Sequence, residues 1–313
     1  MKNQIENKKN FCTYKDINGV CVREIIIDSE KGGDEITVGV IADPHFNKCN
    51  ENDLKNPTLE STHKKRLWLA NGSSVPNAEK SLEAIADCDG MVVCGDALDY
   101  LSEGCAELLY SVIWDNYPDA IVTSGNHELA QRMQGEVEEC LSIEKRIEML
   151  EKIWKHDVFY TSRVLSDKVM LIGIDNSLIM RFTERVVEPL RRDLKLAREK
   201  GYTVLIFYHV PIVTEDPADD SLESSFVGDE NSRVIKLSNY CVSPRSGGAS
   251  LEVYELITNN ADIIGGCFCG HMHADFYTEI IAKDAQKNSR PIPQYLLIGT
   301  PYNNGHALKI RVR

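Results

Sequence analysis

Side chains that can bind metal ions or transfer protons follow five short apolar runs of the sequence, at the point where each run ends. The run before Gly125 is followed by Asn126, His127 and Glu128, and the other runs end in aspartate or histidine. The five stretches are 36–45, 91–99, 120–128, 202–211 and 261–273. In open α/β sheets, ligands bind in the crevice outside the carboxyl ends of the strands. Five strands that end in this way can build one site, and we expect that site to carry out the function of the protein.

The Asp43-Pro44-His45 motif places a carboxylate and an imidazole two residues apart. On an extended chain, side chains at i and i+2 point to the same side, so both could reach one metal ion. Asp96 and Asn126 each follow a glycine at a strand end. Glycine there allows a positive φ and a close approach of the backbone. These motifs therefore predict oxygen and nitrogen ligands where the strands end.

Histidines are concentrated at the same places. Five of the eight histidines lie at these strand ends, and His209, His271 and His273 are among them. Taken singly, an aspartate after glycine is commonly a turn or cap residue, and a histidine at a strand end is commonly a hydrogen-bonded polar residue. The coincidence of five such endings favours a metal site over these separate structural explanations.

The composition is that of a globular protein of 313 residues, which is enough for one large or two ordinary domains. The formal net charge is -13 and no clear basic stripe is present, which disfavours nucleic acid as a partner. A small or medium phosphorylated substrate remains compatible with this charge, because bound divalent metals reverse the local field.

The sequence indicates a location in the cytoplasm. No apolar run approaches the roughly 18 residues that a membrane-spanning helix needs, and the N-terminus is polar, unlike a secretory signal. The ten cysteines are scattered without paired spacing, and disulfides are rare in reducing compartments. We therefore expect a cytoplasmic protein without a membrane partner.

Strand and helix patterns alternate along the chain, which is typical of a single α/β domain. We expect an N-terminal tail over residues 1–18 and one domain over 19–313. The expected strands are 19–27, 36–42, 91–94, 120–123, 169–174, 203–208, 262–268, 294–299 and 307–312. The expected helices begin after Pro76 and cover 102–116, 135–155, 183–200 and 249–259. Gly201 is placed to end the fourth of them as a C-terminal cap.

Two long stretches without a clear period, 46–75 and 212–248, are expected to form rims or lids of the site. The first contains the basic cluster His63-Lys-Lys-Arg66. This cluster could contact a substrate phosphate, but we interpret it as a solvated surface run. The second follows His209 closely and is rich in acidic residues between 215 and 230.

The complete set of motifs resembles the calcineurin-like metallophosphoesterase superfamily. The motifs are Asp-x-His at 43–45, Gly-Asp-x-x-Asp at 95–99, Gly-Asn-His-Glu at 125–128, a histidine at 209 and Gly-His-x-His at 270–273. The resemblance implies an α/β fold, a four-layer α-β-β-α sandwich of two mixed β-sheets with a dinuclear metal site at the C-terminal ends of strands. It also implies phosphodiesterase or phosphomonoesterase activity.

The same resemblance implies roles for individual residues. One metal would be held by Asp43, His45, Asp96 and His273. The second would be held by Asp96, Asn126, His209 and His271. The Asp96 carboxylate would bridge the two metals, and His127 would be the general acid near the leaving oxygen, oriented by Asp99.

The chemistry of these side chains agrees with that assignment. Oxygen and imidazole ligands without thiolate suit Mn, Fe, Zn or Ni. Two metals about 3.5–4 Å apart clamp a phosphoryl group and supply a metal-bound hydroxide. His127 could not easily be a further ligand while it carries a proton, and a carboxylate such as Asp99 would keep it cationic. Glu128 could orient a ligand or be a helix-start carboxylate, and we favour a structural role.

Position 100 narrows the expected activity. The protein phosphatases of the superfamily carry arginine where this chain has Tyr100, so the phosphodiesterase and small-molecule phosphatase branches are favoured. A nuclease is one alternative, but the net charge and the acidic segment weigh against it. A non-catalytic metal-binding scaffold of the same fold is another. Such scaffolds typically lack the acid histidine or some ligands, whereas this chain has every position filled.

Overall fold

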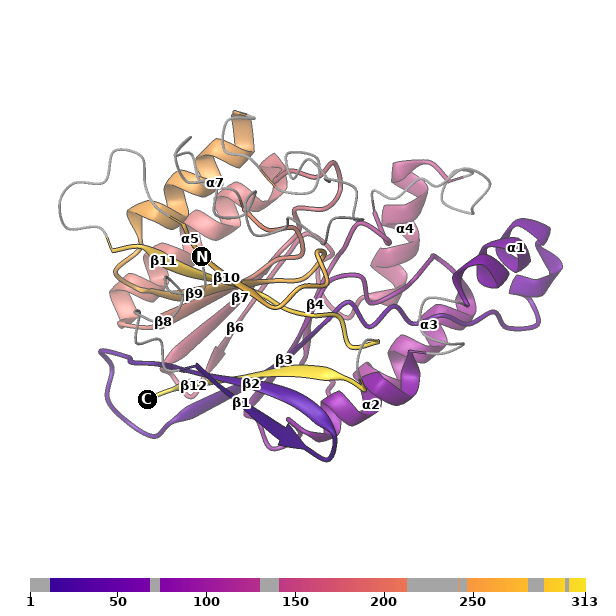
Figure 1. The fold of residues 1–313 in the computed structure, drawn as a ribbon. Helices are drawn as coiled ribbons and strands as arrows, with labels where there is room; N and C mark the ends of the chain where they lie inside the picture. The colour runs from indigo at the N-terminus through magenta and orange to yellow at the C-terminus, as the bar shows by residue number, and fades with distance from the viewer. Residues whose placement is uncertain are drawn as a thin grey trace, which may run out of the picture.

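The fold is built from two six-stranded mixed sheets that face each other, with helices on the outer side of each (Figure 1). The computed structural model describes residues 12–67, 74–129, 141–212, 242, 247–280, 290–301 and 304–313. The predicted α-β-β-α sandwich with two mixed sheets is confirmed. The described helices include none long and apolar enough to cross a bilayer.

The first sheet has the strand order β1-β2-β12-β3-β4-β5. Its strands are β1 (Cys12–Ile17), β2 (Val20–Ile27), β12 (His306–Val312), β3 (Ile36–Ala42), β4 (Gly90–Cys94) and β5 (Ile121–Thr123). Strands β3, β4 and β5 run parallel to one another. Their carboxyl ends therefore share one edge of the sheet, where the first three predicted motifs begin.

The second sheet has the order β10-β11-β9-β8-β7-β6. Its strands are β10 (Phe276–Ile280), β11 (Ile292–Leu296), β9 (Ile264–Cys269), β8 (Thr203–Phe207), β7 (Val169–Ile174) and β6 (Tyr160–Leu165). The four inner strands are parallel to one another, and each edge strand is antiparallel to its inner neighbour. The ends of β8 and β9 carry the remaining two motifs.

The space between the sheets is filled by apolar side chains, because both sheets turn one face of β-branched and aromatic residues inward. Val40 and Val92 of the first sheet and Leu205 of the second belong to this core. The rings of Phe207 and Phe268 stack with centroids 5.1 Å apart. Burial of each such side chain contributes roughly 1.5–3 kcal/mol to stability. This core fixes the two sheets against each other and with them the two groups of strand ends.

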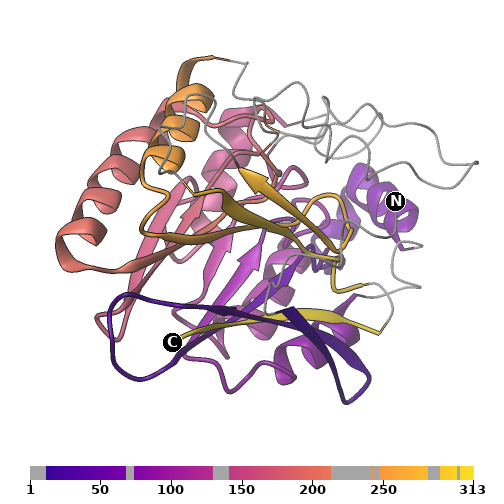
Figure 2. The ribbon, with the colours of Figure 1, turned by 60° about the vertical axis from the view of Figure 1, so that its left-hand side comes forward.

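Helices cover the outer faces of the sheets (Figure 2). Those on the first sheet are α2 (Val75–Glu83), α3 (Glu103–Leu109), which continues as a π-helical turn over Tyr110–Trp114, and α4 (Ile143–Ile153). Those on the second are α5 (Glu184–Lys200) and α7 (Gly248–Asn259), which pack against each other. Gly201 ends α5 in the left-handed conformation with φ +70°, as predicted.

The structure differs from the sequence predictions in several elements. Strand β1 lies within the range expected to be an N-terminal tail, and the edge strands β6 and β10 were not predicted. The stretch 46–75 contains a short 3₁₀ turn (Asp53–Lys55) and the helix α1 (Pro57–Arg66), although its sequence has no apolar period. Most of the predicted lid over 212–248, including its acidic part, lies outside the described residues.

Candidate metal centre

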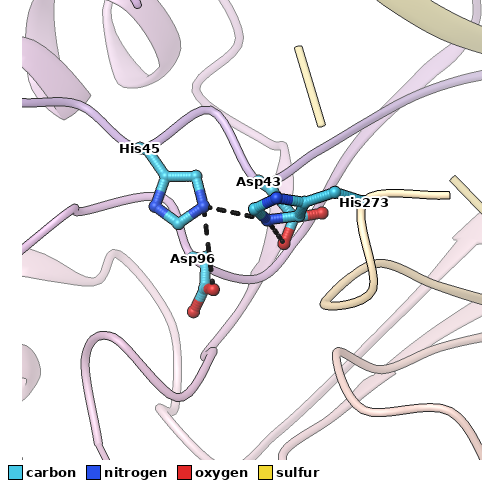
Figure 3. Close-up of side chains that lie close together, drawn as sticks. All are labelled: Asp43, His45, Asp96 and His273. Atoms are coloured by element: carbon cyan, nitrogen blue, oxygen red, sulfur yellow. Dashed lines mark hydrogen bonds and ion pairs between the residues drawn. The ribbon is translucent and has the colours of Figure 1, made fainter. Parts of the chain in front are cut away.

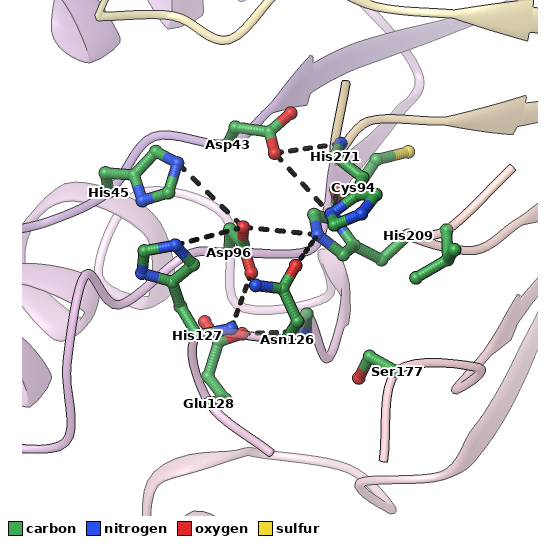
Figure 4. Close-up of polar contacts among 12 residues, drawn as sticks. Asp43, His45, Cys94, Asp96, Asn126, His127, Glu128, Ser177, His209 and His271 are labelled. Carbon is green, nitrogen blue, oxygen red and sulfur yellow. Dashed lines mark hydrogen bonds and ion pairs between the residues drawn. The ribbon is translucent and has the colours of Figure 1, made fainter. Parts of the chain in front are cut away.

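The ends of β3, β4 and β5 meet those of β8 and β9, and all seven predicted metal ligands lie there together (Figures 3 and 4). Main-chain hydrogen bonds join the loops that carry them. The amide of Asp43 donates to the carbonyl of Gly95 at 3.2 Å, and that of Gly270 donates to the carbonyl of His209 at 3.1 Å. The Asp43 bond joins two loops that follow strands of the first sheet, and the Gly270 bond joins two loops that follow strands of the second. Side chains of the two sheets then meet across the sandwich.

Four predicted ligands of the first metal form one group (Figure 3). Each of Asp43, His45, Asp96 and His273 offers one potential ligand atom, and these atoms lie within 4.8 Å of one another. The Nε2 atoms of His45 and His273 are 3.2 Å apart. His273 Nε2 is 3.3 Å from Asp43 Oδ1, and His45 Nε2 is 3.9 Å from Asp96 Oδ2. A single cation could therefore contact all four side chains.

The predicted ligands of the second metal form a neighbouring group (Figure 4). Potential ligand atoms of Asp96, His209 and His271 lie within 4.8 Å of one another. His209 Nε2 is 3.2 Å from Asp96 Oδ2 and 3.0 Å from the side-chain oxygen of Asn126. Asp96 belongs to both groups, which is the position that a bridging carboxylate requires.

The chemistry and the burial of the donor atoms fit metal ions. Asp43 Oδ2 is buried and accepts no hydrogen bond from the described residues. The Nε2 atoms of His45 and His273 face each other at 3.2 Å, so in their unprotonated form both could direct a lone pair at one ion. Buried polar groups are normally paired, and carboxylates and imidazoles converging in this way are the ligands that Mn, Fe, Zn and Ni accept. The residues present therefore fit a pair of cations.

Five of the predicted ligands have left-handed backbone conformations. Their φ angles are +47° at Asp43, +47° at His45, +46° at Asp96, +68° at His271 and +49° at His273. Such conformations are uncommon for residues other than glycine, cost of order 1–3 kcal/mol each and cluster at functional sites. The prediction that Asp43 and His45 share one side of an extended chain was wrong in its geometry. Alternating left-handed residues, repeated at 271 and 273, turn these side chains toward the site.

Three glycines before ligand positions leave room for ligands from other strands. A β-carbon at any of them would overlap a neighbouring side chain, so only glycine fits. The β-carbon would lie 2.3 Å from His209 Nδ1 at position 95, 2.1 Å from Asp96 Oδ1 at position 125 and 2.4 Å from Asp43 Oδ2 at position 270. Gly95 uses the positive φ that glycine allows, +71°, whereas Gly125 does not have a positive φ.

His127 is oriented through its main chain and its ring. Its amide donates to Asp96 Oδ1 at 2.9 Å, and ring Nδ1 lies 2.8 Å from the carbonyl oxygen of Asp99. A carbonyl only accepts, so Nδ1 carries the proton of this bond. Ring Nε2 lies 3.8 Å from Asp96 Oδ2, on the side of the ligand groups. Asp99 thus fixes the ring of His127, the partnership that the sequence analysis predicted.

The charges of the site hold one another in place. Burial alone would raise the pKa of the Asp96 carboxyl, but His209 and His127 hold it well below its usual value. Burial would likewise lower the pKa of both histidines, but Asp96 outweighs it and, with Asp99 beside His127, raises the pKa of His127 to about 9 and of His209 to about 10. Burial and the charge of His209 lower the pKa of His271 to about 3. In the metal-free site, the Asp96 carboxylate therefore favours the cationic forms of His127 and His209.

Glu128 joins the loops that carry two predicted ligands, which is closer to the ligand-orienting alternative than to the helix-start role that was favoured. It is fully buried, and its two carboxylate oxygens accept the amides of Leu98 and Gly125, each at 2.7 Å. Burial and the charge of Asp96 raise the pKa of Glu128 to about 8. The side chain thus ties the loop after β4 to the loop after β5 and holds Asp96 beside Asn126.

Asn176, at the end of β7, supports the site in a way that the sequence analysis did not predict. Its side-chain amide donates to the carbonyl of Val210 at 2.6 Å, and its side-chain oxygen accepts the Val210 amide at 2.9 Å. Both groups of the residue after His209 are thereby satisfied in the buried interior. An asparagine two residues after the end of an apolar strand was the available signal.

The interpretation of 63–66 as a solvated surface run was wrong for Arg66 and His63. Arg66 is 8% exposed, and its Nη1 lies 3.3 Å from Asp99 Oδ1 and 3.4 Å from His127 Nδ1. His63 is half-buried and contacts Asn47 and Tyr100. The available signal was the Asn56-Pro57 pair, a helix-start pattern in which the Asn56 side chain accepts the Thr58 amide at 3.0 Å.

Comparisons with known proteins agree with this geometry. The family model of the calcineurin-like phosphoesterases matches residues 36–275, a range that contains every ligand position described above. A comparison with curated proteins gave no match.

A solved phosphatase structure shares the fold. A purple acid phosphatase from seeds of yellow lupin (Lupinus luteus) matches with a TM-score of 0.51 and 12% identity, over 89% of this chain and 46% of the lupin chain. A dimetal phosphatase from Danio rerio matches with a TM-score of 0.48 and 12% identity, over 87% of this chain and 90% of that one. The chain thus spans about half the length of the lupin protein, and at this identity the likeness concerns the fold.

Proposed function

The chain belongs to the calcineurin-like phosphoesterase family, and on that premise we propose that it hydrolyses phosphate esters with a dinuclear metal centre. The observation that carries the proposal is the place of Asp96, whose carboxylate belongs to both ligand groups. One shared carboxylate between two groups of carboxylate, imidazole and amide donors is the arrangement that a metal pair needs.

The first ion would be held by Asp43, His45, Asp96 and His273, and the second by Asp96, Asn126, His209 and His271. Two divalent ions bound in this way polarise a phosphate and activate water for in-line displacement. Manganese, iron, zinc or nickel would suit these ligands. Because two ions carry +4 and only Asp43 and Asp96 are anionic ligands, the loaded site would attract a phosphate despite the net charge of -13.

His127 is the proton donor in this proposal. The carbonyl of Asp99 holds the Nδ1 proton, so Nε2 is the ring atom that is free to exchange a proton with the substrate. The leaving oxygen takes the proton of Nε2 as its bond to phosphorus breaks. Water forms the new bond to phosphorus, and the proton that it releases restores His127. A positioned general acid of this kind contributes about 10²–10⁴-fold in rate.

The substrate that we propose is a small or medium phosphomonoester or phosphodiester. A long polyanion would be repelled by a chain with 48 acidic and 35 basic residues.

A cytoplasmic location belongs to the same proposal, because the described cysteines with placed side chains are all free thiols and reducing compartments keep thiols in this state.

Turnover of p-nitrophenyl phosphate and bis-p-nitrophenyl phosphate by the full chain tests the proposal. After loading with Mn²⁺, Zn²⁺ or Fe²⁺, at least one of the two esters should be hydrolysed, and chelation should abolish the reaction. Metal retention without turnover of either ester would favour a non-catalytic scaffold. Faster cleavage of short oligonucleotides than of both small esters would favour a nuclease.

A further inference from the structure

Helix α1 reaches the site through its last residue, Arg66. The guanidinium Nη1 lies 3.3 Å from Asp99 Oδ1, and the Arg66 side chain is almost fully buried. Burying a charged group is costly unless it is paired with an opposite charge. Asp99 supplies this charge, so the position of Arg66 depends on the carboxylate that lies beside His127.

One oxygen of Asp99 is shared by three side chains. Asp99 Oδ1 lies 3.3 Å from Arg66 Nη1, 3.3 Å from His127 Nδ1 and 3.3 Å from His45 Nδ1. Arg66 Nη1 is itself only 3.4 Å from His127 Nδ1. A guanidinium has donors only, and this Nδ1 donates to the Asp99 carbonyl, so the two nitrogens cannot bond to each other. The negative charge of the Asp99 carboxylate, which contacts both nitrogens, offsets their repulsion at this short distance.

The other oxygen of Asp99 is also held from the side of α1. The side-chain amide of Asn47 donates to Asp99 Oδ2 at 2.8 Å. The Asn47 oxygen lies 2.7 Å from His63 Nδ1, one turn before Arg66 on α1. Tyr100 Oη lies 2.8 Å from the same nitrogen of His63. With both oxygens engaged, the Asp99 carboxylate is held in one orientation beside Nδ1 of His127.

We propose that Arg66 is a positioning residue for proton donation by His127. It holds the Asp99 carboxylate against Nδ1 of His127, the ring atom that also donates to the Asp99 carbonyl, and so helps to keep Nε2 on the side of the ligand groups. The proposal rests on the hydrolytic function proposed above. It predicts that Arg66 serves the step that protonates the leaving group, because the Asp99 carboxylate that it contacts lies beside the His127 ring that carries that proton.

The test compares two phosphate esters, a phenyl ester and a p-nitrophenyl ester. They differ in how much the leaving oxygen needs to be protonated by an acid. Phenyl esters need protonation of the leaving oxygen far more than p-nitrophenyl esters do. Arg66→Met keeps the side-chain length without the charge, and Arg66→Lys keeps the charge without the planar fork. Lys64→Met, on the exposed face of the same helix, removes an equal charge away from the site. His127→Ala gives the reference profile for loss of the acid.

We expect Arg66→Met to lower kcat for the phenyl ester by about 10–100-fold, the range typical of residues that orient a site group. The p-nitrophenyl ester should lose much less, KM should stay near the wild-type value, and Arg66→Lys should recover part of the loss. Lys64→Met should resemble the wild type with both esters. Circular dichroism establishes that each variant is folded.

Several results would overturn the inference. Equal losses with both esters would indicate a general structural role, and a raised KM with unchanged kcat would indicate direct phosphate binding. Unfolding of both Arg66 variants would likewise assign the residue to stability. If the wild type hydrolyses neither ester after metal loading, the proposed function itself fails. If the wild type and His127→Ala differ as expected while Arg66→Met matches the wild type, only the role of Arg66 fails.

Discussion

Gly270 lies so close to Asp43 that a β-carbon at position 270 would be 2.4 Å from Asp43 Oδ2. This oxygen is buried, and no described residue donates a hydrogen bond to it. The amide of His271, the next residue, donates instead to Asp43 Oδ1 at 3.0 Å. The loop after β9 thus holds the Asp43 carboxylate in place through a hydrogen bond. This contact joins the two sheets at the candidate metal centre.

Replacing Gly270 with alanine should therefore weaken the first metal site. The added methyl group would push against Asp43 Oδ2, and displacement of a ligand or its support typically costs 10–100-fold in metal affinity. Competition with a chelator of known affinity measures the effect. Gly32→Ala is the matched control, because position 32 has open space around its β-carbon. Equal affinities for wild type and Gly270→Ala would show that Asp43 is not held in this way.

His127→Ala should retain the metals and lose turnover. His127 is not one of the predicted metal ligands, but its ring Nε2 lies on the side of the ligand groups. We expect a rate about 10²–10⁴-fold lower, as for loss of a general acid. Steady-state kinetics together with metal content check both parts. A variant with wild-type turnover would remove the proton-donor role, and a variant without metal would make His127 a ligand.

Metal binding should release protons at pH 7. The pKa of His209 is raised to about 10 in the metal-free site, above its ordinary 6.5, so the ring is protonated at pH 7 and must lose this proton to bind a metal. Affinity should consequently rise by about tenfold per pH unit between pH 7 and 9 for each proton released. The same raised pKa stabilises the metal-free fold fully below pH 6.5, and this contribution is lost as the pH rises through about 10.

Titration calorimetry in buffers of different ionisation enthalpy measures the protons that are released. The observed enthalpy should depend on the buffer at pH 7. Enthalpies that are the same in all buffers, with an affinity that does not change with pH, would contradict a protonated His209 in the metal-free site.

Glu128→Gln should destabilise the protein. One carboxylate oxygen would become an amide group facing the main-chain N–H of Leu98 or Gly125, and a buried donor without an acceptor costs about 1–3 kcal/mol. Urea unfolding of the metal-free protein gives the difference. Glu151→Gln, an exposed change on α4, is the control. Identical unfolding midpoints for Glu128→Gln and wild type would exclude the bracing role.

The strands of the site could be predicted because their sequences are apolar runs bounded by glycine or polar residues. For β7 the prediction gave the same bounds as the structure, 169–174, and the ligands followed from their places after such runs. The backbone conformation of Asp43 and His45 could not be predicted in this way. It depends on bonds across the loops, such as that from the His45 amide to the Asp96 carbonyl at 3.0 Å.

Helix α1 shows why the rest was missed. Its ten residues, 57–66, have no apolar stripe, and the residues that it buries are Thr62 and Arg66. Periodicity detects burial only where the buried residues are apolar. Arg66 is buried because Asp99, 33 residues away, balances its charge. The identity of a basic residue gives no information about a partner so distant in the sequence. The 63–66 cluster was therefore predicted to lie on the surface.

The number of manganese ions retained by the wild type and by Asp96→Asn, measured by elemental analysis after loading, tests the central claim most directly. Because Asp96 belongs to both ligand groups, the wild type should hold two ions per chain and the variant should lose both together. A wild type that retains no metal, or a variant that loses only one ion, would contradict a shared carboxylate between two cations.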